Sequence, residues 1–292
     1  MHGSPGDGLA PNVTVAVVCH RGIAVEKGGR SKNEDNFLVA KDGECCVRDG
    51  ETEMRVRQPT VGVLVAVADG MGGHTNGDLA SGAAVRSLLH LVRSVPGLEP
   101  QQELRRFLLK AHARLQSMAR ENQASDMGTT VLAAWLLQDE VHWVNVGDSR
   151  LYHVRNSALR CVTRDQTRGE FARRDGRPPP SDAEHLAQSF VFGSRGLGHD
   201  DEIRIDEGID TGRFRVRSGD QLVLCTDGLW AFVDDFTILE SLRASPDPVE
   251  NARWLNDRAM SLGGDDNITA VVVRFYDVVP VQRQEDPPTH QP

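Results

Sequence analysis

The chain has 292 residues, of which 39% are hydrophobic, so it is long and apolar enough to bury a substantial core. Its formal net charge of -9 argues against nucleic acid as the main partner, because binding a polyanion requires a basic surface. No apolar run approaches the roughly 20 residues of a membrane helix, and the first residues lack the basic and apolar regions of a signal peptide. We therefore expect a cytoplasmic protein, a monomer by default, that binds neither nucleic acid nor membrane.

The hydrophobic patterning predicts separate groups of strands and helices along the chain. Apolar and β-branched runs predict strands, and apolar residues at helical spacing predict helices. The first predicted elements are strands at 13–20, 35–40 and 61–68, with a hairpin over 41–60. Two helices follow, one that begins at Asp78 and is stopped by Pro96 and Gly97, and one over 101–122. The rest of the chain is predicted to form strands at 129–137, 141–147, 150–155, 158–163, 203–207 and 221–226, helices at 235–244 and 248–262, and a last strand at 268–275.

The remaining segments are polar or rich in turn-forming residues. We expect residues 1–12, which are rich in Gly and Pro, and residues 277–292, which are rich in Pro and Gln, to be disordered. Residues 164–200 are predicted to form a surface flap.

Because strands and helices come in groups and do not alternate strictly, the predicted fold class is α+β with antiparallel sheets. The aspartate-bearing strands extend over most of the chain, so residues 13–276 are expected to form a single domain.

Four apolar runs end or begin at an aspartate. VLVAVADG reaches Asp69, VNVGDSR reaches Asp148 and LVLCTDGLW reaches Asp227, whereas in GGDDNITAVVV the acid Asp266 precedes the run. Carboxylates that converge without partners repel one another, and a bound cation removes that penalty. With oxygen ligands only, the favoured ion is Mg²⁺ or Mn²⁺. The alternative is that each aspartate caps a helix or forms an Asx-turn, which explains one such site better than four.

Six stretches together resemble the motifs of the bacterial metal-dependent serine/threonine protein phosphatases of type 2C. In chain order they are RSKNEDNF, VADGMGGH, MGTTVLAAW, VNVGDSRLY, LCTDGLW and GGDDNITAVVV, from residue 30 to residue 273. The resemblance implies a four-layer α-β-β-α sandwich of two antiparallel sheets flanked by helices. It also implies two Mn²⁺ or Mg²⁺ ions at one end of the sandwich, with a weaker third ion in bacterial members.

The resemblance assigns the metal ligands residue by residue. Asp69 matches the carboxylate that bridges both ions, and Gly70 matches the residue that donates a backbone carbonyl, which the following glycines leave accessible. The first ion is implied to take Asp227 and Asp266. The second is implied to lie beside Glu34 and Asp35, and the weaker third ion beside Asp148 and Asp227.

Three further residues are candidates for catalytic or supporting roles. Arg30 matches the arginine that binds the substrate phosphate, a task that suits a planar fork of donors. His74 is a candidate general acid, although animal members place that histidine directly after the Asp-Gly pair, where Met71 stands here. Asn267 is predicted to support the site through a hydrogen bond, its alternative role being a cap at the start of a strand.

The implied reaction is hydrolysis of phosphoserine and phosphothreonine on proteins by direct attack of a metal-bridging hydroxide. One alternative is a phosphatase in which Asp227 itself attacks phosphorus, but such enzymes carry a second aspartate two residues later, where this chain has Leu229. The other is a catalytically dead relative that binds phosphoproteins, although such relatives usually lose the aspartates that this chain retains. The implied partners are phosphorylated protein substrates and a cognate serine/threonine kinase.

Overall fold

The computed structural model describes residues 10–49, 52–71, 76–93, 99–121, 127–178 and 208–280. Three predicted features lie wholly or mostly outside these residues: the termini predicted to be disordered, the strand at 203–207 and the flap.

The described ends of the chain contact the rest of the fold. The backbone N–H of Tyr276 donates to the carbonyl of Asn12 at 2.8 Å, and the backbone N–H of Val278 donates to Ser218 Oγ at 2.8 Å. No helix among the described residues is both long enough and apolar enough to cross a membrane.

Seven strands form the larger sheet, in the spatial order β12-β9-β8-β5-β2-β3-β4 with every neighbouring pair antiparallel. They are β2 (Asn36–Lys41), β3 (Glu44–Asp49), β4 (Thr52–Arg57), β5 (Val63–Ala68), β8 (Val131–Leu137), β9 (Glu140–Val146) and β12 (Asp210–Arg215). The hairpin predicted over 41–60 is the β3–β4 pair, which extends this sheet at one edge.

Five strands form the smaller sheet, in the order β1-β14-β13-β10-β11, again with antiparallel neighbours. They are β1 (Val13–His20), β10 (Arg150–Arg155), β11 (Ala158–Cys161), β13 (Gln221–Cys225) and β14 (Ile268–Phe275). A separate short pair joins β6 (Gly70–Met71) to β7 (Gly128–Thr129).

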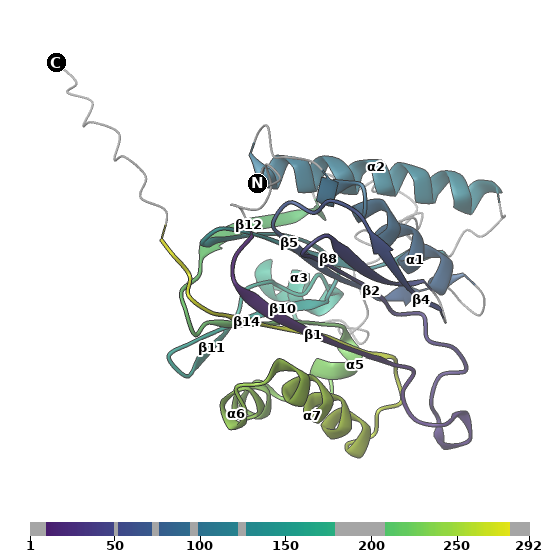
Figure 1. The fold of residues 1–292 in the computed structure, drawn as a ribbon. Coiled ribbons are helices and arrows are strands. Elements are labelled where there is room, and N and C mark those ends of the chain that lie inside the picture. Colours follow the sequence, from purple (N-terminus) through teal and green to yellow (C-terminus); the bar gives the residue numbers. More distant parts are fainter. Residues whose placement is uncertain are drawn as a thin grey trace.

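Helices cover the outer face of each sheet (Figure 1). The helices among the described residues are α1 (Gly77–Leu88), α2 (Pro100–Glu121), α3 (Arg168–Arg174), α5 (Asp227–Trp230), α6 (Asp235–Ala244) and α7 (Pro248–Ser261), with single 3₁₀ turns η1 (Val25–Lys27) and η2 (Leu91–Arg93). The pair α1 and α2 packs on the larger sheet, whereas α6 and α7 pack on the smaller one.

Three apolar cores separate the four layers. Leu88, Leu104 and Leu108 of α1 and α2 pack with side chains of the larger sheet in the first core. The second core lies between the two sheets, and the third holds Leu255 and its neighbours between the smaller sheet and α6 and α7. Each fully buried aliphatic side chain stabilises such a core by roughly 1.5–3 kcal/mol. The predicted fold class, an α-β-β-α sandwich of antiparallel sheets, is therefore confirmed.

Among the described residues, sequence patterning missed β12, α3 and α5, as well as the two-residue strand β6 and the single turn η1. In β12 alternate residues are exposed, and Gly212 replaces a side chain where a Cβ would lie 2.5 Å from the ring of Trp143. Such a polar edge strand lacks the apolar run that predicts buried strands. The helices α3 and α5 span seven and four residues, too few to show helical periodicity. Part of the segment predicted as a flap is therefore helical.

Candidate metal centre

The predicted metal ligands lie at one end of the two sheets, because the strands that carry them pair with one another there. In the larger sheet Asn36, the first residue of β2, pairs with Ala68, the last residue of β5. Asp35 precedes the first of these strands and Asp69 follows the second, so both leave the sheet at the same end.

The smaller sheet brings three more carboxylates to its corresponding end. Cys225, the last residue of β13, pairs with Arg150 of β10 on one side and with Ala270 of β14 on the other. Just beyond these strand ends come Asp148, Asp227 and Asp266.

The carboxylates of both sheets act on Asp69. Burial raises the pKa of Asp69 well above its usual value, and the nearby charges of Asp227, Asp35, Asp148 and Asp266 raise it further, in that order. These residues belong to five separate segments, and their charges act on one another because the fold gathers them in a poorly hydrated space. The structure therefore brings five of the predicted ligands into one cluster.

Three of these aspartates, Asp35, Asp148 and Asp227, have a buried Oδ1 atom that accepts no hydrogen bond. Asp35 is fully buried, and its Oδ2 accepts a hydrogen bond from Thr226 Oγ1 at 2.8 Å. Burial raises the pKa of Asp35 to about 7, against the lowering effect of hydrogen bonds from Thr269 and Thr226, and nearby aspartates add to the rise. Buried carboxylate oxygens without partners are costly. A cation would satisfy them.

The same physical causes act on two of the aspartates of the smaller sheet, Asp148 and Asp227. Burial is the main reason that the pKa of Asp148 is raised well above its usual value, followed by the charge of Asp227. Burial also raises the pKa of Asp227, followed by the charge of Asp266. Each carboxylate thus makes its neighbour harder to ionise, as expected where like charges converge without a counterion.

The donor set fits a hard divalent cation. Carboxylate and carbonyl oxygens are the ligands that Mg²⁺ and Mn²⁺ prefer, and the described cluster offers no thiolate or imidazole. Among the described residues, however, no three His, Cys, Asp or Glu side chains stand at the mutual spacing of an ion site. The cluster instead includes an ion pair with Arg30, whose Nη2 donates to Asp266 Oδ2 at 2.7 Å.

Arg30 lies at the exposed rim of the cluster. Its side chain is 58% exposed, whereas that of Asp266 is 29% exposed. The hydrogen bond to Asp266 is the main reason that the pKa of Arg30 is raised, and the charges of Asp69 and Asp227 contribute. A guanidinium that faces both the cluster and solvent is placed to meet an anion that enters from outside.

Glu34 and Gly70 lie against the start of α1. A Cβ on Gly70 would stand 2.2 Å from the carbonyl oxygen of Gly77 and 2.6 Å from that of Glu34, so only glycine fits there. Ser81 Oγ donates to the carbonyl of Glu34 at 2.5 Å. Burial raises the pKa of the Glu34 carboxyl, with Asp78 as the next cause. The predicted acidic residue and the predicted carbonyl donor are therefore neighbours.

Asn267 supports this arrangement through the main chain. Its Oδ1 accepts from the backbone N–H of Glu34 at 2.7 Å, and its Nδ2 donates to the carbonyls of Arg21 and Lys32, both at 2.9 Å. The residue is 6% exposed. These bonds tie the segment bearing Glu34 and Asp35 to the start of β14.

One predicted site residue and several contributing ones remain to be placed. His74 lies outside the described residues. Sequence patterning missed Ser81 and Thr226, whose hydroxyls bond to Glu34 and Asp35. No local signal marks these partners, although Thr226 directly precedes Asp227 in the quoted LCTDGLW stretch.

The chain combines an α-β-β-α sandwich with a cluster of carboxylates at one end of its two sheets. The family described as Protein phosphatase 2C matches residues 47–262 of the chain. The chain therefore belongs to this family.

Relatives and a solved structure agree with this membership. Serine/threonine phosphatase stp of Listeria innocua serovar 6a is 32% identical over 250 residues, which make up 84% of this chain and 90% of that protein. Serine/threonine protein phosphatase PstP of Mycobacterium tuberculosis (strain ATCC 25618 / H37Rv) is 34% identical over 215 residues, or 73% of this chain, but the chain spans only 40% of that protein's length. The crystal structure of the PstP catalytic domain in complex with two manganese ions has a TM-score of 0.69 at 29% identity, covering 91% of this chain and 99% of that chain.

Proposed function

We propose that this chain is a metal-dependent serine/threonine protein phosphatase that hydrolyses phosphoserine and phosphothreonine esters on proteins. The observation that carries the proposal is the convergence on Asp69 of the charges of Asp35, Asp148, Asp227 and Asp266. Buried carboxylates that face one another destabilise the fold, and Arg30 pairs with Asp266, so a cation is the expected counterpart of the others. The family and its members named as serine/threonine phosphatases support the reaction.

Two ions would be held by the clustered oxygens, with Asp69 between them. Asp227 and Asp266 would hold one, and the Gly70 carbonyl with Glu34 and Asp35 would line the other. When bound, such ions act as Lewis acids and activate water for attack on phosphorus. Mn²⁺ or Mg²⁺ would serve, and the buried oxygen of Asp148 would complete a weaker third position beside Asp227.

Arg30 would bind the substrate phosphate. Its guanidinium stands at the exposed rim and bonds Asp266 at 2.7 Å, so it can exchange this carboxylate for phosphate oxygens without crossing the site. A bidentate pair with phosphate also orients the ester. His74 is proposed as the donor of a proton to the leaving alcohol, which requires hydrogen-bond reach to that oxygen.

The proposed partners are phosphorylated proteins and the serine/threonine kinase whose products the enzyme reverses. A cytoplasmic location and a monomeric state complete the proposal. The net charge of -9 supports the absence of nucleic acid from the list of partners.

Phosphate release from a phosphothreonine peptide tests the function. Protein stripped of metal is expected to be inactive and to gain activity on addition of Mn²⁺ or Mg²⁺. Arg30→Ala is expected to lower kcat/KM by about 10–100-fold, because a hydrogen bond between charged groups contributes about 1.5–3 kcal/mol. The matched control is Arg243→Ala, which removes an arginine of similar exposure that pairs with Glu240 on α6. It should leave activity unchanged.

Two outcomes would overturn the proposal. Turnover that persists without any metal would favour direct attack by Asp227, and a trapped phosphoenzyme would identify it. Failure of the folded, Mn²⁺-loaded protein to release phosphate from several phosphopeptides would instead favour a relative that only binds phosphoproteins.

A further inference from the structure

The indole of Trp230 connects two of the clustered aspartates. The helix α5 is a single turn that begins at Asp227 and ends at Trp230. The Nε1–H of Trp230 donates to the backbone carbonyl of Asp148 at 3.1 Å. The same short helix therefore carries one carboxylate and contacts the main chain of another, which lies 79 residues earlier in the sequence.

One oxygen of the Asp148 carboxylate has no hydrogen-bond partner to hold it in place. Its Oδ1 atom is buried and accepts no hydrogen bond, and the residue is 4% exposed. The preceding residue, Gly147, is held from both sides by Gln166. Gly147 donates its backbone N–H to Gln166 Oε1 at 2.6 Å, and its carbonyl accepts from the backbone N–H of Gln166 at 3.1 Å. With Gly147 fixed in this way, the bond from Trp230 holds the next carbonyl of the chain, that of Asp148.

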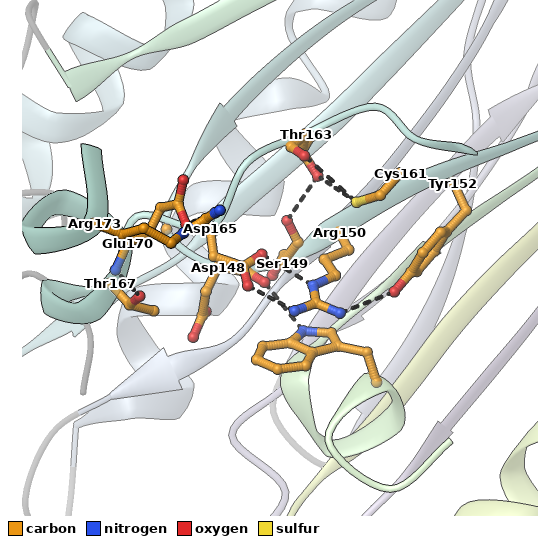
Figure 2. A network of polar contacts seen from close by, with 12 residues as sticks. Asp148, Ser149, Arg150, Tyr152, Cys161, Thr163, Asp165, Thr167, Glu170 and Arg173 are labelled. Atoms are coloured by element: carbon orange, nitrogen blue, oxygen red, sulfur yellow. Dashed lines mark hydrogen bonds and ion pairs between the residues drawn. The ribbon is translucent and has the colours of Figure 1, made fainter. Parts of the chain in front are cut away.

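Arg150 contacts the indole. Asp165 and Tyr152 in turn hold the guanidinium of Arg150 (Figure 2). The guanidinium carbon of Arg150 lies 3.7 Å from the centre of a Trp230 ring, in the geometry of a cation–π contact. Arg150 Nε and Nη2 donate to the two carboxylate oxygens of Asp165 at 3.0 and 2.7 Å, and Nη1 donates to Tyr152 Oη at 3.1 Å. Each of the three guanidinium nitrogens therefore donates one hydrogen bond, and together these bonds fix the orientation of the fork over the ring.

We propose that Trp230, held by Arg150 and Asp165, is a positioning residue that sets the relative placement of the Asp148 and Asp227 carboxylates. It thereby sets the affinity for the cation that these two side chains share. This inference rests on the proposed function. A bond from an indole to a ligand's own carbonyl acts on the metal site as second-layer partners of metal ligands do.

Trp230→Phe tests the proposal, because it keeps an aromatic side chain beside Arg150 and removes the five-membered ring that carries the N–H donor. Binding of Mn²⁺ to metal-stripped protein is followed by calorimetry and by electron paramagnetic resonance of free Mn²⁺, beside the melting temperature. We expect the weakest class of Mn²⁺ site to lose about tenfold in affinity, the lower range for second-layer partners, and the tighter sites to be unchanged. The matched control is Trp254→Phe on α7, where the tryptophan is 44% exposed.

Asp165→Asn is the second variant, because it loosens Arg150 without touching the indole. It is expected to weaken the same class of site by a smaller factor. A Trp230→Phe protein with the wild-type Mn²⁺ isotherm, whether or not its melting temperature falls, would overturn the proposal and leave a purely structural contact. Wild-type protein that binds no Mn²⁺ would instead overturn the proposed function itself, and this inference with it.

Discussion

The pKa of a buried aspartate is shifted in opposite directions at the two ends of the sandwich. At the end away from the metal centre, Asp220 is 2% exposed and accepts hydrogen bonds from Arg155 Nη2 at 2.6 Å and from the backbone N–H of Arg217 at 3.0 Å. His153 Nε2 lies 2.9 Å from the same carboxylate. Burial alone would raise the pKa of Asp220, but the bonds from His153 and Arg155 lower it to about 2.

At the other end, Asp35 and Asp148 are buried to a similar degree but face other carboxylates and have oxygens without partners. Their pKa values are raised instead. The strand β10 runs between the two environments, with Arg155 at one end and Arg150 beside Asp148 at the other. Burial is common to both ends, so the partner decides the sign of the pKa shift. Asp220, which has cationic partners, stabilises the fold, whereas the carboxylates with partnerless oxygens lie at the candidate metal centre.

The largest effect is expected from Asp69→Asn. Removing the residue at the centre of the cluster should lower phosphatase activity with saturating Mn²⁺ by more than about 100-fold, since even second-layer partners of metals cost 10–100-fold. The same change should raise the melting temperature of metal-free protein, because it deletes one of several mutually repelling buried carboxylates. Phosphopeptide kinetics and thermal melting measure the two effects.

Asp257→Asn serves as the control, since this aspartate is exposed on α7. It should alter neither quantity. If Asp69→Asn lowered the stability of metal-free protein as Asp220 variants should, the contrast between the two ends of the sandwich would be wrong.

Asp220→Asn should produce the opposite combination. It leaves Arg155 and His153 beside an uncharged amide in a buried position, and we expect the free energy of unfolding to fall by about 3 kcal/mol. Specific activity of the folded protein should stay the same, because Asp220 lies at the other end of the sandwich. Urea unfolding and phosphopeptide kinetics report the two quantities.

A matched control is Asp175→Asn, which breaks an ion pair with Arg177 whose side chains are 59% and 66% exposed. Exposed pairs contribute about 1 kcal/mol or less, so this variant should be close to wild type. An equal loss in both variants would mean that burial does not strengthen the Asp220 pair.

The smallest effect, and the most diagnostic of the contrast, is the pH dependence of stability. The pKa of Asp220 is lower in the folded protein than in the unfolded chain, so its contribution is present above pH 4 and is lost as the pH falls from about 4 to about 2. The pKa of Asp35 is raised to about 7, so its protonated form is favoured in metal-free folded protein. Stability should therefore decline as the pH rises from about 4 to about 7.

Thermal melting of metal-free protein across this pH range measures both trends. Asp35→Asn should reduce the decline toward neutral pH, and Asp220→Asn should remove the loss at acid pH. Saturating Mn²⁺ should also suppress the decline near neutrality, since a cation then replaces the proton. A metal-free protein whose stability rises steadily from pH 4 to 7 would contradict the assignment of unpaired carboxylates.

Much of the fold follows from local sequence. The β5 run VLVAVA and the β14 run ITAVVVRF are almost wholly buried, and such runs can satisfy their backbone groups only within a sheet. By contrast β12 is a polar edge strand recognised only by its pairing with β9, and α5 forms where a short segment turns beside β14. Elements that owe their existence to neighbours leave little periodic signal.

In the candidate site, too, some features follow from local sequence and others depend on tertiary contacts. Local sequence patterning placed Asp69, Asp148, Asp227 and Asp266 at strand ends, and the ends of antiparallel strands meet at the edges of a sandwich. The hydrogen bonds that hold the segments bearing the acidic residues could be identified only from the tertiary structure. Asn267 bonds to Glu34 across 233 residues, and Trp230 bonds to Asp148 across 82. Hydrogen bonds depend on distance in space and not on spacing in the chain, so the contacts that orient these carboxylates exist only once both sheets have packed together.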